Sequence, residues 1–133
     1  FVCPTEITAL SDEIEAFHAL NCEVLGVSTD SVHSHRAWIR TPREQNGLGE
    51  INYPLASDIT KEVSRAYGVL VEEKGIALRG LFIIDPDGIV RYEVVHDLNI
   101  GRNVGEVLRV LQALQTGGLC PVNWVPGKAT LSV

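Results

Sequence analysis

The sequence predicts an α/β fold in which helices flank a central mixed β-sheet. Apolar residues recur at helical spacing near both ends of the chain, and two β-rich runs between them are separated by the turn sequence Asp-Pro-Asp-Gly. The 133 residues are 45% hydrophobic and 21% charged, which fits one globular domain with a buried core. The net charge of -6 offers no basic field to phosphates, and no apolar run approaches the roughly 20 residues of a bilayer span. Neither nucleic acid nor a membrane is therefore an expected partner.

Apolar spacing predicts a helix close to the start of the chain. Residues 1–4 read as the end of a strand, and Pro4 stands where a first helical residue would. The helix is expected over residues 4–20, with its N-terminus at Cys3, because apolar side chains recur there at intervals of three and four. These side chains are Ile7, Leu10, Ile14, Phe17 and Leu20.

The next segments alternate between extended and helical patterns. Residues 22–28 form a short apolar run of strand type, and the capping sequence Thr-Asp-Ser then introduces a second helix over about 31–45. After a break at Asn-Gly-Leu-Gly, the segment around Pro54 is expected to be extended. A short third helix follows over residues 59–67, which Asp58 can cap.

The remaining residues predict a hairpin, a last helix and an irregular tail. β-rich runs at 78–84 and 88–95 lie on either side of a turn in which proline presets φ and glycine tolerates a positive φ. Residues 103–115 carry five apolar side chains on one helical face, and the chain from Gly117 onward is rich in Gly and Pro. The order of elements matches the thioredoxin-like arrangement. We expect one domain over 1–116 and a C-terminal tail over 117–133.

Three cysteines direct attention to redox chemistry, because an odd number cannot pair completely within one subunit. Cys3, at a helix N-terminus directly after a strand, lies where free backbone N–H groups favour a thiolate. Ionising most of a free thiol at pH 7 requires roughly 3.4 kcal/mol, whereas a helix dipole supplies about 0.3–2 kcal/mol. A fixed cation is also needed, and Arg79 is the candidate. On position alone, a buried, inert Cys3 stays equally open.

The other two cysteines have different surroundings. Cys120 lies in the irregular tail, where a thiol can be presented to a partner or can simply be tolerated. A predicted helix about 24 Å long separates Cys22 from Cys3, whereas a disulfide needs Cα atoms within about 7 Å, so these two cannot pair in one intact fold. Cys22 begins an apolar strand and is expected to be a packed core residue.

Several motifs in sequence order resemble a known family. The chain carries FVCPTE at 1–6, HRAWIRTPREQNGLG at 35–49, ALRGLFIIDPDG at 77–88, GR at 101–102 and LCPVNW at 119–124. These segments look like a typical two-cysteine peroxiredoxin, a family of thiol-dependent peroxidases. The resemblance runs along essentially the whole chain.

The resemblance implies a reaction path and partners. Cys3 matches the peroxidatic cysteine, whose thiolate attacks a hydroperoxide and becomes a sulfenic acid. Cys120 matches the resolving cysteine, which comes from the other subunit of a dimer and forms a disulfide. Thioredoxin or a similar dithiol protein then reduces that disulfide. The resemblance implies no cofactor and no metal; it implies a homodimer and allows a decameric ring.

Further residues match supporting positions of the family. Arg79 matches the arginine that stabilises the thiolate and the peroxide oxygens, and Pro4 matches the proline that shields the cysteine from water. Glu6 and Arg102 match members of the surrounding hydrogen-bond network, although Glu6 alone reads as an ordinary first-turn acid.

The chain departs from the family pattern at its ends. The proline and threonine that precede Phe-Val-Cys in the family motif are missing, as are the usual N-terminal strands, so we expect that an N-terminal segment has been lost. A cytoplasmic location is expected, although a lost segment could have carried an organellar address. No Tyr-Phe helix follows Cys120, which predicts resistance to over-oxidation.

The sequence also allows two alternative functions. A thiol–disulfide oxidoreductase is disfavoured because Glu6 stands where a Cys-x-x-Cys motif needs its second cysteine. A redox-regulated holdase chaperone is the non-enzymatic alternative. A metal site at His33 and His35 is disfavoured because residues two apart on a helix face in different directions.

Overall fold

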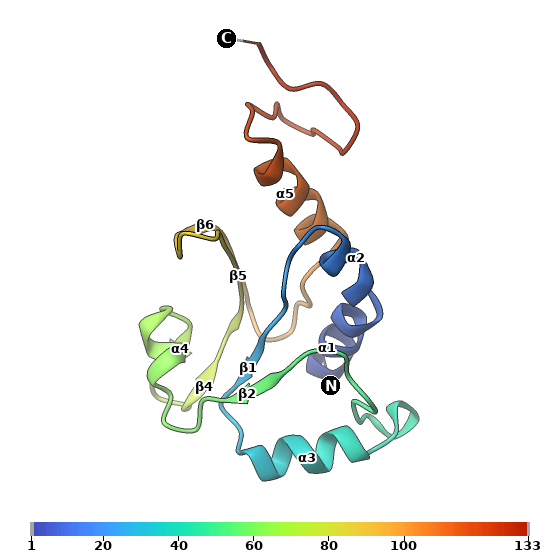
Figure 1. Cartoon of the computed structure of the whole chain (residues 1–133). Helices are drawn as coiled ribbons and strands as arrows, with labels where there is room; N and C mark the ends of the chain where they lie inside the picture. The colour runs from blue at the N-terminus through green and yellow to red at the C-terminus, as the bar shows by residue number, and fades with distance from the viewer. Residues whose placement is uncertain (1, 133) are drawn as a thin grey trace. The chain divides into compact units, whose positions relative to one another are not determined.

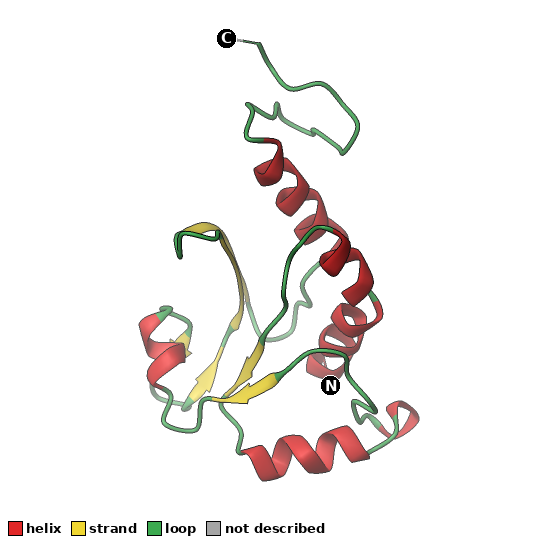
Figure 2. Ribbon diagram, viewed as in Figure 1, coloured by secondary structure: helices red, strands yellow, loops and turns green. Residues whose placement is uncertain are grey.

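The computed structural model describes residues 2–132, which divide into two compact units. Among these residues, the first unit contains 2–81 and 94–102, and the second contains 82–93 and 103–132. The helices are α1 (Val2–Asp12), α2 (Ile14–Ala19), α3 (Val32–Arg40), the single turn η1 (Arg43–Gln45), α4 (Glu62–Ala66) and α5 (Val104–Thr116) (Figure 1). The strands are β1 (Gly26–Ser28), β2 (Leu55–Ser57), β3 (Leu70–Val71), β4 (Ile76–Ala77), β5 (Arg79–Ile84) and β6 (Val90–His96) (Figure 2).

The first helical region differs from the single helix expected over residues 4–20. Helix α1 already begins at Val2, so the strand end expected at residues 1–4 is wrong from Val2 onward; Phe1 lies outside the described residues. The helix is interrupted at Glu13, whose N–H is shared between the carbonyls of Ala9 and Leu10. The last turn of α1 is also held from outside, because the Ser11 hydroxyl accepts the Asn52 N–H at 2.8 Å.

Helix α3 confirms the predicted cap but is shorter than expected. The Ser31 hydroxyl accepts the Ser34 N–H, as an N-cap residue does. The helix ends at Arg40 rather than near residue 45 because Thr41 precedes Pro42 and adopts an extended conformation. Gly47 then passes so close to the chain that an added Cβ would lie 2.0 Å from the Thr41 carbonyl oxygen. This close approach needs glycine and lets the loop close over the fully buried Leu48.

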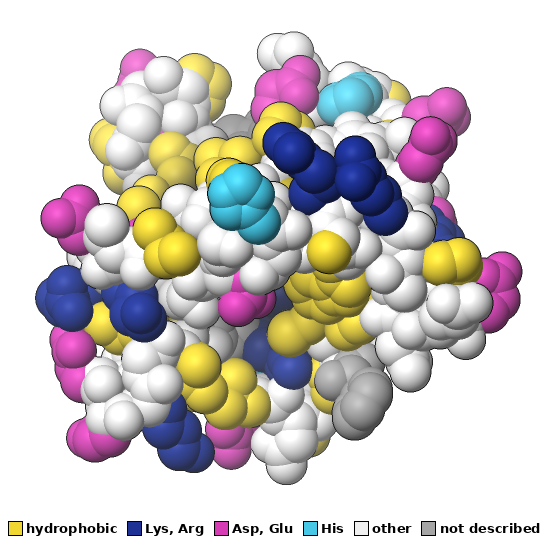
Figure 3. Space-filling model, turned by 90° about the horizontal axis from the view of Figure 1, so that it is seen from below, with side chains coloured by type: hydrophobic (Ala, Val, Ile, Leu, Met, Phe, Trp, Pro, Cys, Tyr) yellow, Lys and Arg dark blue, Asp and Glu magenta, His cyan; other side chains and the backbone are white. Residues whose placement is uncertain are grey.

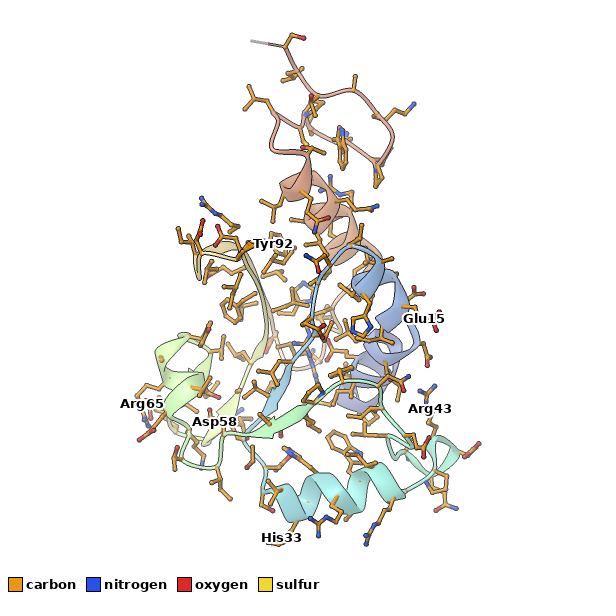
Figure 4. All side chains as sticks on the ribbon, in the orientation of Figure 1. Glu15, His33, Arg43, Asp58, Arg65 and Tyr92 are labelled. Carbon is orange, nitrogen blue, oxygen red and sulfur yellow. The ribbon has the colours of Figure 1, made fainter. Side chains whose placement is uncertain are left out.

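Helix α4 is held by the predicted acidic cap. Both carboxylate oxygens of the buried Asp58 accept backbone N–H groups, from Val63 at 3.1 Å and from Ser64 at 2.7 Å. Asp58 lies at the start of this helical region and Arg65 on its outer side (Figure 4). The helix spans Glu62–Ala66, within the expected 59–67. The short antiparallel pair β3–β4, which turns through Gly75 at φ 64°, was not predicted.

The strands pair two by two rather than in one continuous sheet. β1 and β2 are parallel, with Val27 opposite Ala56, and α3 packs against β2. β5 pairs with β6 across the Asp-Pro-Asp-Gly turn, which confirms the predicted hairpin. β1 begins only at Gly26, because residues 22–25 lack strand pairing, so Cys22 does not head a strand as expected. The single mixed sheet is therefore seen here as three two-stranded sheets.

The second unit contains the predicted last helix and the tail. Asn103 caps α5 by accepting the Glu106 N–H at 3.0 Å, and Gly117 ends the helix at φ 67°. As far as Ser132 the tail is irregular, as predicted, apart from a bridge between Leu119 and Leu131. The buried apolar residues of the first unit are Ile14, Phe17, Leu48, Tyr53 and Val69, and those of the second are Val107, Leu111 and Trp124.

Candidate active site

Cys3 and Arg79 are brought together in the first unit. Cys3 lies half-buried in the first turn of α1, and Arg79 is the first residue of β5. The Arg79 Nη1 lies 2.9 Å from the Cys3 Sγ, although the two residues are 76 positions apart in the chain. A fixed positive charge therefore lies at hydrogen-bond distance from the sulfur. The predicted pairing of a helix-start cysteine with a strand-start arginine is therefore present.

The guanidinium of Arg79 is held by three hydrogen bonds from two of its nitrogens. Its Nε donates to the Leu98 carbonyl at 2.6 Å, and Nη1 donates to the Glu6 Oε1 at 2.6 Å as well as to the sulfur. The side chain is only 8% exposed, so water competes little for these donors. The arginine therefore presents one nitrogen to the sulfur in a single orientation.

Glu6 joins the two arginines of the site. It lies three residues after Cys3 on α1, which places both side chains on the same side of the helix. Its Oε2 accepts the Arg102 Nε at 2.6 Å and the Arg102 backbone N–H at 2.7 Å. Arg102 also donates to the Gly80 carbonyl, next to Arg79. Glu6 is thus the centre of a buried ion-pair network, more than a first-turn acid.

The charges of this network determine its protonation. Burial raises the pKa of Glu6, but the hydrogen bonds and charge of Arg102, together with the charge of Arg79, outweigh burial and hold that pKa below its ordinary value. Burial lowers the pKa of Arg79, whereas its bonds to Cys3 and Glu6 raise it, and the result lies above the ordinary value. At neutral pH the site therefore holds one carboxylate between two guanidinium groups.

Two supporting groups were not predicted from the sequence. The Tyr53 hydroxyl donates to the Ile7 carbonyl of α1 at 2.9 Å, and burial raises the pKa of Tyr53 to about 12. The Leu98 carbonyl, in the loop after β6, accepts the Arg79 Nε. Neither group could be found from a motif. Tyr53 is a single tyrosine in a loop, and the Leu98 carbonyl is a backbone group that any residue type would supply. Pro4 is half-buried, and its carbonyl accepts the Thr8 hydroxyl at 2.7 Å.

All three cysteine thiols are free. Cys120 belongs to the second unit, where its Sγ lies 3.5 Å from the Thr116 Oγ1 and 3.7 Å from the Ala113 carbonyl oxygen. Cys22 is half-buried in a loop and is not the core residue that was expected. Burial, with a smaller effect of Glu23, raises the pKa of the Cys22 thiol, which makes it less reactive.

A shallow pocket of about 280 Å³ lies on α3. It is lined by Val32, His35, Arg36, Ile39, Arg40 and Leu55. Figure 3 shows the side of the molecule on which α3 lies, where basic side chains are placed beside apolar ones. His35 is buried and His33 points outward (Figure 4), so the two rings face apart as predicted.

Among residues 2–132, no three His, Cys, Asp or Glu side chains gather as a metal ion would require. No helix in the same residues has the length and apolar character to cross a bilayer.

Comparison with known proteins defines the class. A model of the AhpC/TSA family matches residues 1–93. The chain is 65% identical over 131 residues to the putative peroxiredoxin YkuU of Bacillus subtilis, and this match covers 98% of this chain and 73% of YkuU. It is 57% identical over 135 residues to the mitochondrial thioredoxin-dependent peroxide reductase of Mus musculus, and this match covers 98% of this chain and 52% of the mouse protein. The solved structure of a reduced 2-Cys peroxiredoxin from Plasmodium vivax matches with a TM-score of 0.95 and 46% identity, over 98% of this chain and 69% of that one.

The chain therefore belongs to the AhpC/TSA family. Within it, the shared sequence and the matching structure make it a 2-Cys peroxiredoxin with a thioredoxin-like fold. It is an oxidoreductase of the thiol-dependent peroxidase class. The predicted fold class and enzyme class are confirmed, and neither the thiol–disulfide oxidoreductase nor the chaperone is favoured.

Proposed function

We propose that Cys3 is the peroxidatic cysteine and that it reduces hydrogen peroxide and organic hydroperoxides. The thiolate sulfur attacks the terminal peroxide oxygen, a new S–O bond forms and the O–O bond breaks. The leaving oxygen takes up a proton and departs as water or an alcohol, and Cys3 becomes a sulfenic acid. The observation that carries this proposal is the 2.9 Å contact between the Cys3 Sγ and the Arg79 Nη1.

In this scheme Arg79 has two tasks. Its positive charge stabilises the thiolate before the reaction, and its donors can reach the oxygens of a peroxide approaching the sulfur. The developing negative charge on the leaving oxygen then meets a cation that is already fixed, so no reorganisation is needed at the moment of reaction. Pro4, in the same helical turn as Cys3, limits the access of water to the sulfur.

Glu6 and Arg102 act as positioning residues. The Glu6 carboxylate holds the Arg79 Nη1 at 2.6 Å, and Arg102 holds the other carboxylate oxygen. Without them the long arginine side chain would keep several rotamers and would meet the sulfur only part of the time. The network therefore supports the reaction through the orientation of Arg79.

Cys120, in the tail over 117–133, is proposed as the resolving cysteine. Its sulfur attacks the Cys3 sulfenic acid of the other subunit of a homodimer, forming a disulfide and releasing water. Thioredoxin or a similar dithiol protein reduces this disulfide and restores both thiols. Further assembly of dimers into a decameric ring and a cytoplasmic location are part of the same proposal. The related proteins include one from the bacterium Bacillus subtilis, one named as chloroplastic and one named as mitochondrial.

Replacing single cysteines tests these roles. Cys3→Ser should abolish peroxide consumption with a dithiol reductant, because a serine hydroxyl is not ionised at neutral pH. Cys22→Ser is the matched control and should retain wild-type turnover, since the Cys22 thiol is half-buried and outside the network. Turnover within twofold of wild type in Cys3→Ser would refute the assignment.

A further inference from the structure

The loop that follows β6 supplies three contacts to the candidate active site. In this site loop, residues 97–102, the Leu98 carbonyl accepts the Arg79 Nε at 2.6 Å. Arg102 donates its backbone N–H to the Glu6 Oε2 at 2.7 Å and its Nε to the same oxygen at 2.6 Å. The loop lies wholly in the first unit. The orientation of Arg79 and Glu6 therefore depends on the conformation of the site loop.

His96, the last residue of β6, holds this loop by a hydrogen bond. Its ring Nδ1 lies 3.1 Å from the Gly101 carbonyl oxygen, five residues further along the chain. Because a carbonyl oxygen can only accept, the Nδ1 carries the proton in this contact. The histidine is half-buried, and the contact joins the two ends of the site loop. The bond therefore limits how far the loop can open.

The Gly101 carbonyl and the Arg102 N–H belong to one peptide unit. This unit is trans, so it is planar and carries the two groups on opposite sides. One side accepts from His96, and the other side donates to Glu6. A rotation of the peptide plane that breaks one of these bonds therefore misaligns the other. Each bond also polarises the other through the peptide.

The backbone of Gly101 also packs against α1. A Cβ added at Gly101 would lie 3.5 Å from the Val2 Cγ1 and 3.7 Å from the Glu6 Cγ, which are ordinary van der Waals distances. Val2 and Glu6 lie on either side of Cys3 at the start of α1. The part of the site loop that His96 holds therefore lies against the helical turn that carries the cysteine.

We infer that His96 is a positioning residue for the oxidation of Cys3 by peroxide. It holds the peptide unit whose N–H binds Glu6. Glu6 in turn holds the Arg79 Nη1, which contacts the Cys3 sulfur. His96 touches no reacting atom and acts only through these neighbours. The inference rests on the proposed peroxidatic role of Cys3.

The expected size of the effect follows from the loss of one hydrogen bond. A neutral bond of this kind shifts an equilibrium between open and closed forms by roughly two- to tenfold. Without the His96 donor, the site loop spends less time closed, and peroxide meets a fully aligned Arg79 less often. Oxidation of Cys3 by peroxide should therefore slow by roughly two- to tenfold.

Two variants separate the Nδ1 donor from the shape of the ring. His96→Phe keeps a planar ring but removes the donor, whereas His96→Asn places an amide NH₂ group near the position of the Nδ1. The full-length protein is mixed rapidly with hydrogen peroxide and quenched, and mass spectrometry follows the Cys3 thiol. His96→Phe should lower the second-order rate by roughly two- to tenfold, and His96→Asn should restore at least about half of the wild-type rate. An unchanged rate in His96→Phe, or a loss that His96→Asn does not restore, would overturn the inference.

Alkylation shows whether the effect is specific to peroxide. Iodoacetamide reacts with the Cys3 sulfur but has no pair of oxygens to be aligned with Arg79. His96→Phe should therefore change the alkylation rate less than twofold, and equal losses in the two reactions would contradict a positioning role. His18→Phe is the matched control and should change neither rate, because His18 lies on α2 and pairs with Glu23 at the surface.

A double-mutant cycle tests the path through Glu6. When Glu6→Gln has already loosened Arg79, adding His96→Phe should slow the reaction less than twofold further. Losses that multiply independently would overturn this path. Wild-type Cys3 that reacts with peroxide no faster than Cys22 would instead refute the proposed function.

Discussion

Glu6→Gln tests the buried network that orients Arg79. The Glu6 side chain is 4% exposed and accepts three hydrogen bonds, from Arg79 at 2.6 Å and from Arg102 at 2.6 and 2.7 Å. Glutamine keeps one acceptor oxygen but turns an NH₂ group towards a guanidinium, so one arginine loses its partner. Removing one member of a buried ion pair costs about 3–5 kcal/mol. Arg102 is 21% exposed and can recover some water, so about 3 kcal/mol is expected.

The pH dependence of this loss has a definite sign. Because the pKa of Glu6 is lowered in the folded protein, the contribution of the Glu6 carboxylate to the free energy of unfolding is fully present above the unfolded-state pKa of about 4.3. It is lost as the pH falls through the lower folded-state value. Wild type and Glu6→Gln should therefore differ most near pH 7 and converge in acid.

Urea unfolding at pH 7 and in acid, monitored by circular dichroism, measures both effects. Glu72→Gln is the control, because Glu72 pairs with Arg65 at the surface, where its side chain is 61% exposed. That variant should lose less than about 1 kcal/mol. If Glu6→Gln were no less stable than Glu72→Gln at pH 7, or if its deficit persisted unchanged in acid, the network would not have the assigned strength.

Three further predictions concern single side chains. Arg79→Lys should slow oxidation of Cys3 by peroxide at least about tenfold in stopped-flow assays, because one ammonium cannot hold Glu6, the Leu98 carbonyl and the sulfur together; an unchanged second-order rate would remove Arg79 from the mechanism. Cys120→Ser should permit one stoichiometric oxidation and then stall with a thioredoxin-type reductant, and non-reducing electrophoresis should show no disulfide-linked dimer; normal turnover would exclude Cys120. Between pH 10 and 12 the unfolded wild-type chain loses the Tyr53 proton, whereas the folded protein keeps it to about pH 12, so wild type should lose up to about 2.7 kcal/mol of its free energy of unfolding. Tyr53→Phe should lose less over the same interval in urea titrations, and parallel pH profiles would contradict the raised pKa.

The local signals of the sequence were sufficient for most helices and for the hairpin. Ser31, Asp58 and Asn103 cap helices through their own side chains, so the cap is encoded within a few residues of the helix it serves. Helix ends were less predictable. Apolar spacing runs unbroken through Glu13, whereas the interruption there accompanies contacts from Ser11 and Tyr53 that join distant segments. The two-residue strands β3 and β4 are too short for a period-two pattern to show.

The candidate site was predictable where chemistry restricts the residue type. The need for a fixed cation near a helix-start thiol selected Arg79, which the structure places at hydrogen-bond distance from Cys3. Glu6 and Arg102 came only from the family resemblance, because a first-turn acid is common and nothing local links it to an arginine 96 residues away. The Leu98 carbonyl carries no side-chain signal and became visible only in the structure.

Trapping the oxidised cysteine tests the central claim most directly. Cys120→Ser protein treated with one equivalent of hydrogen peroxide in the presence of dimedone, which reacts with sulfenic acids, is digested and mapped by mass spectrometry. The label should appear on the peptide containing Cys3 and not on the peptide containing Cys22. A label on Cys22, or rapid consumption of peroxide with Cys3 still unlabelled and reduced, would contradict the assignment of Cys3 as the peroxidatic cysteine.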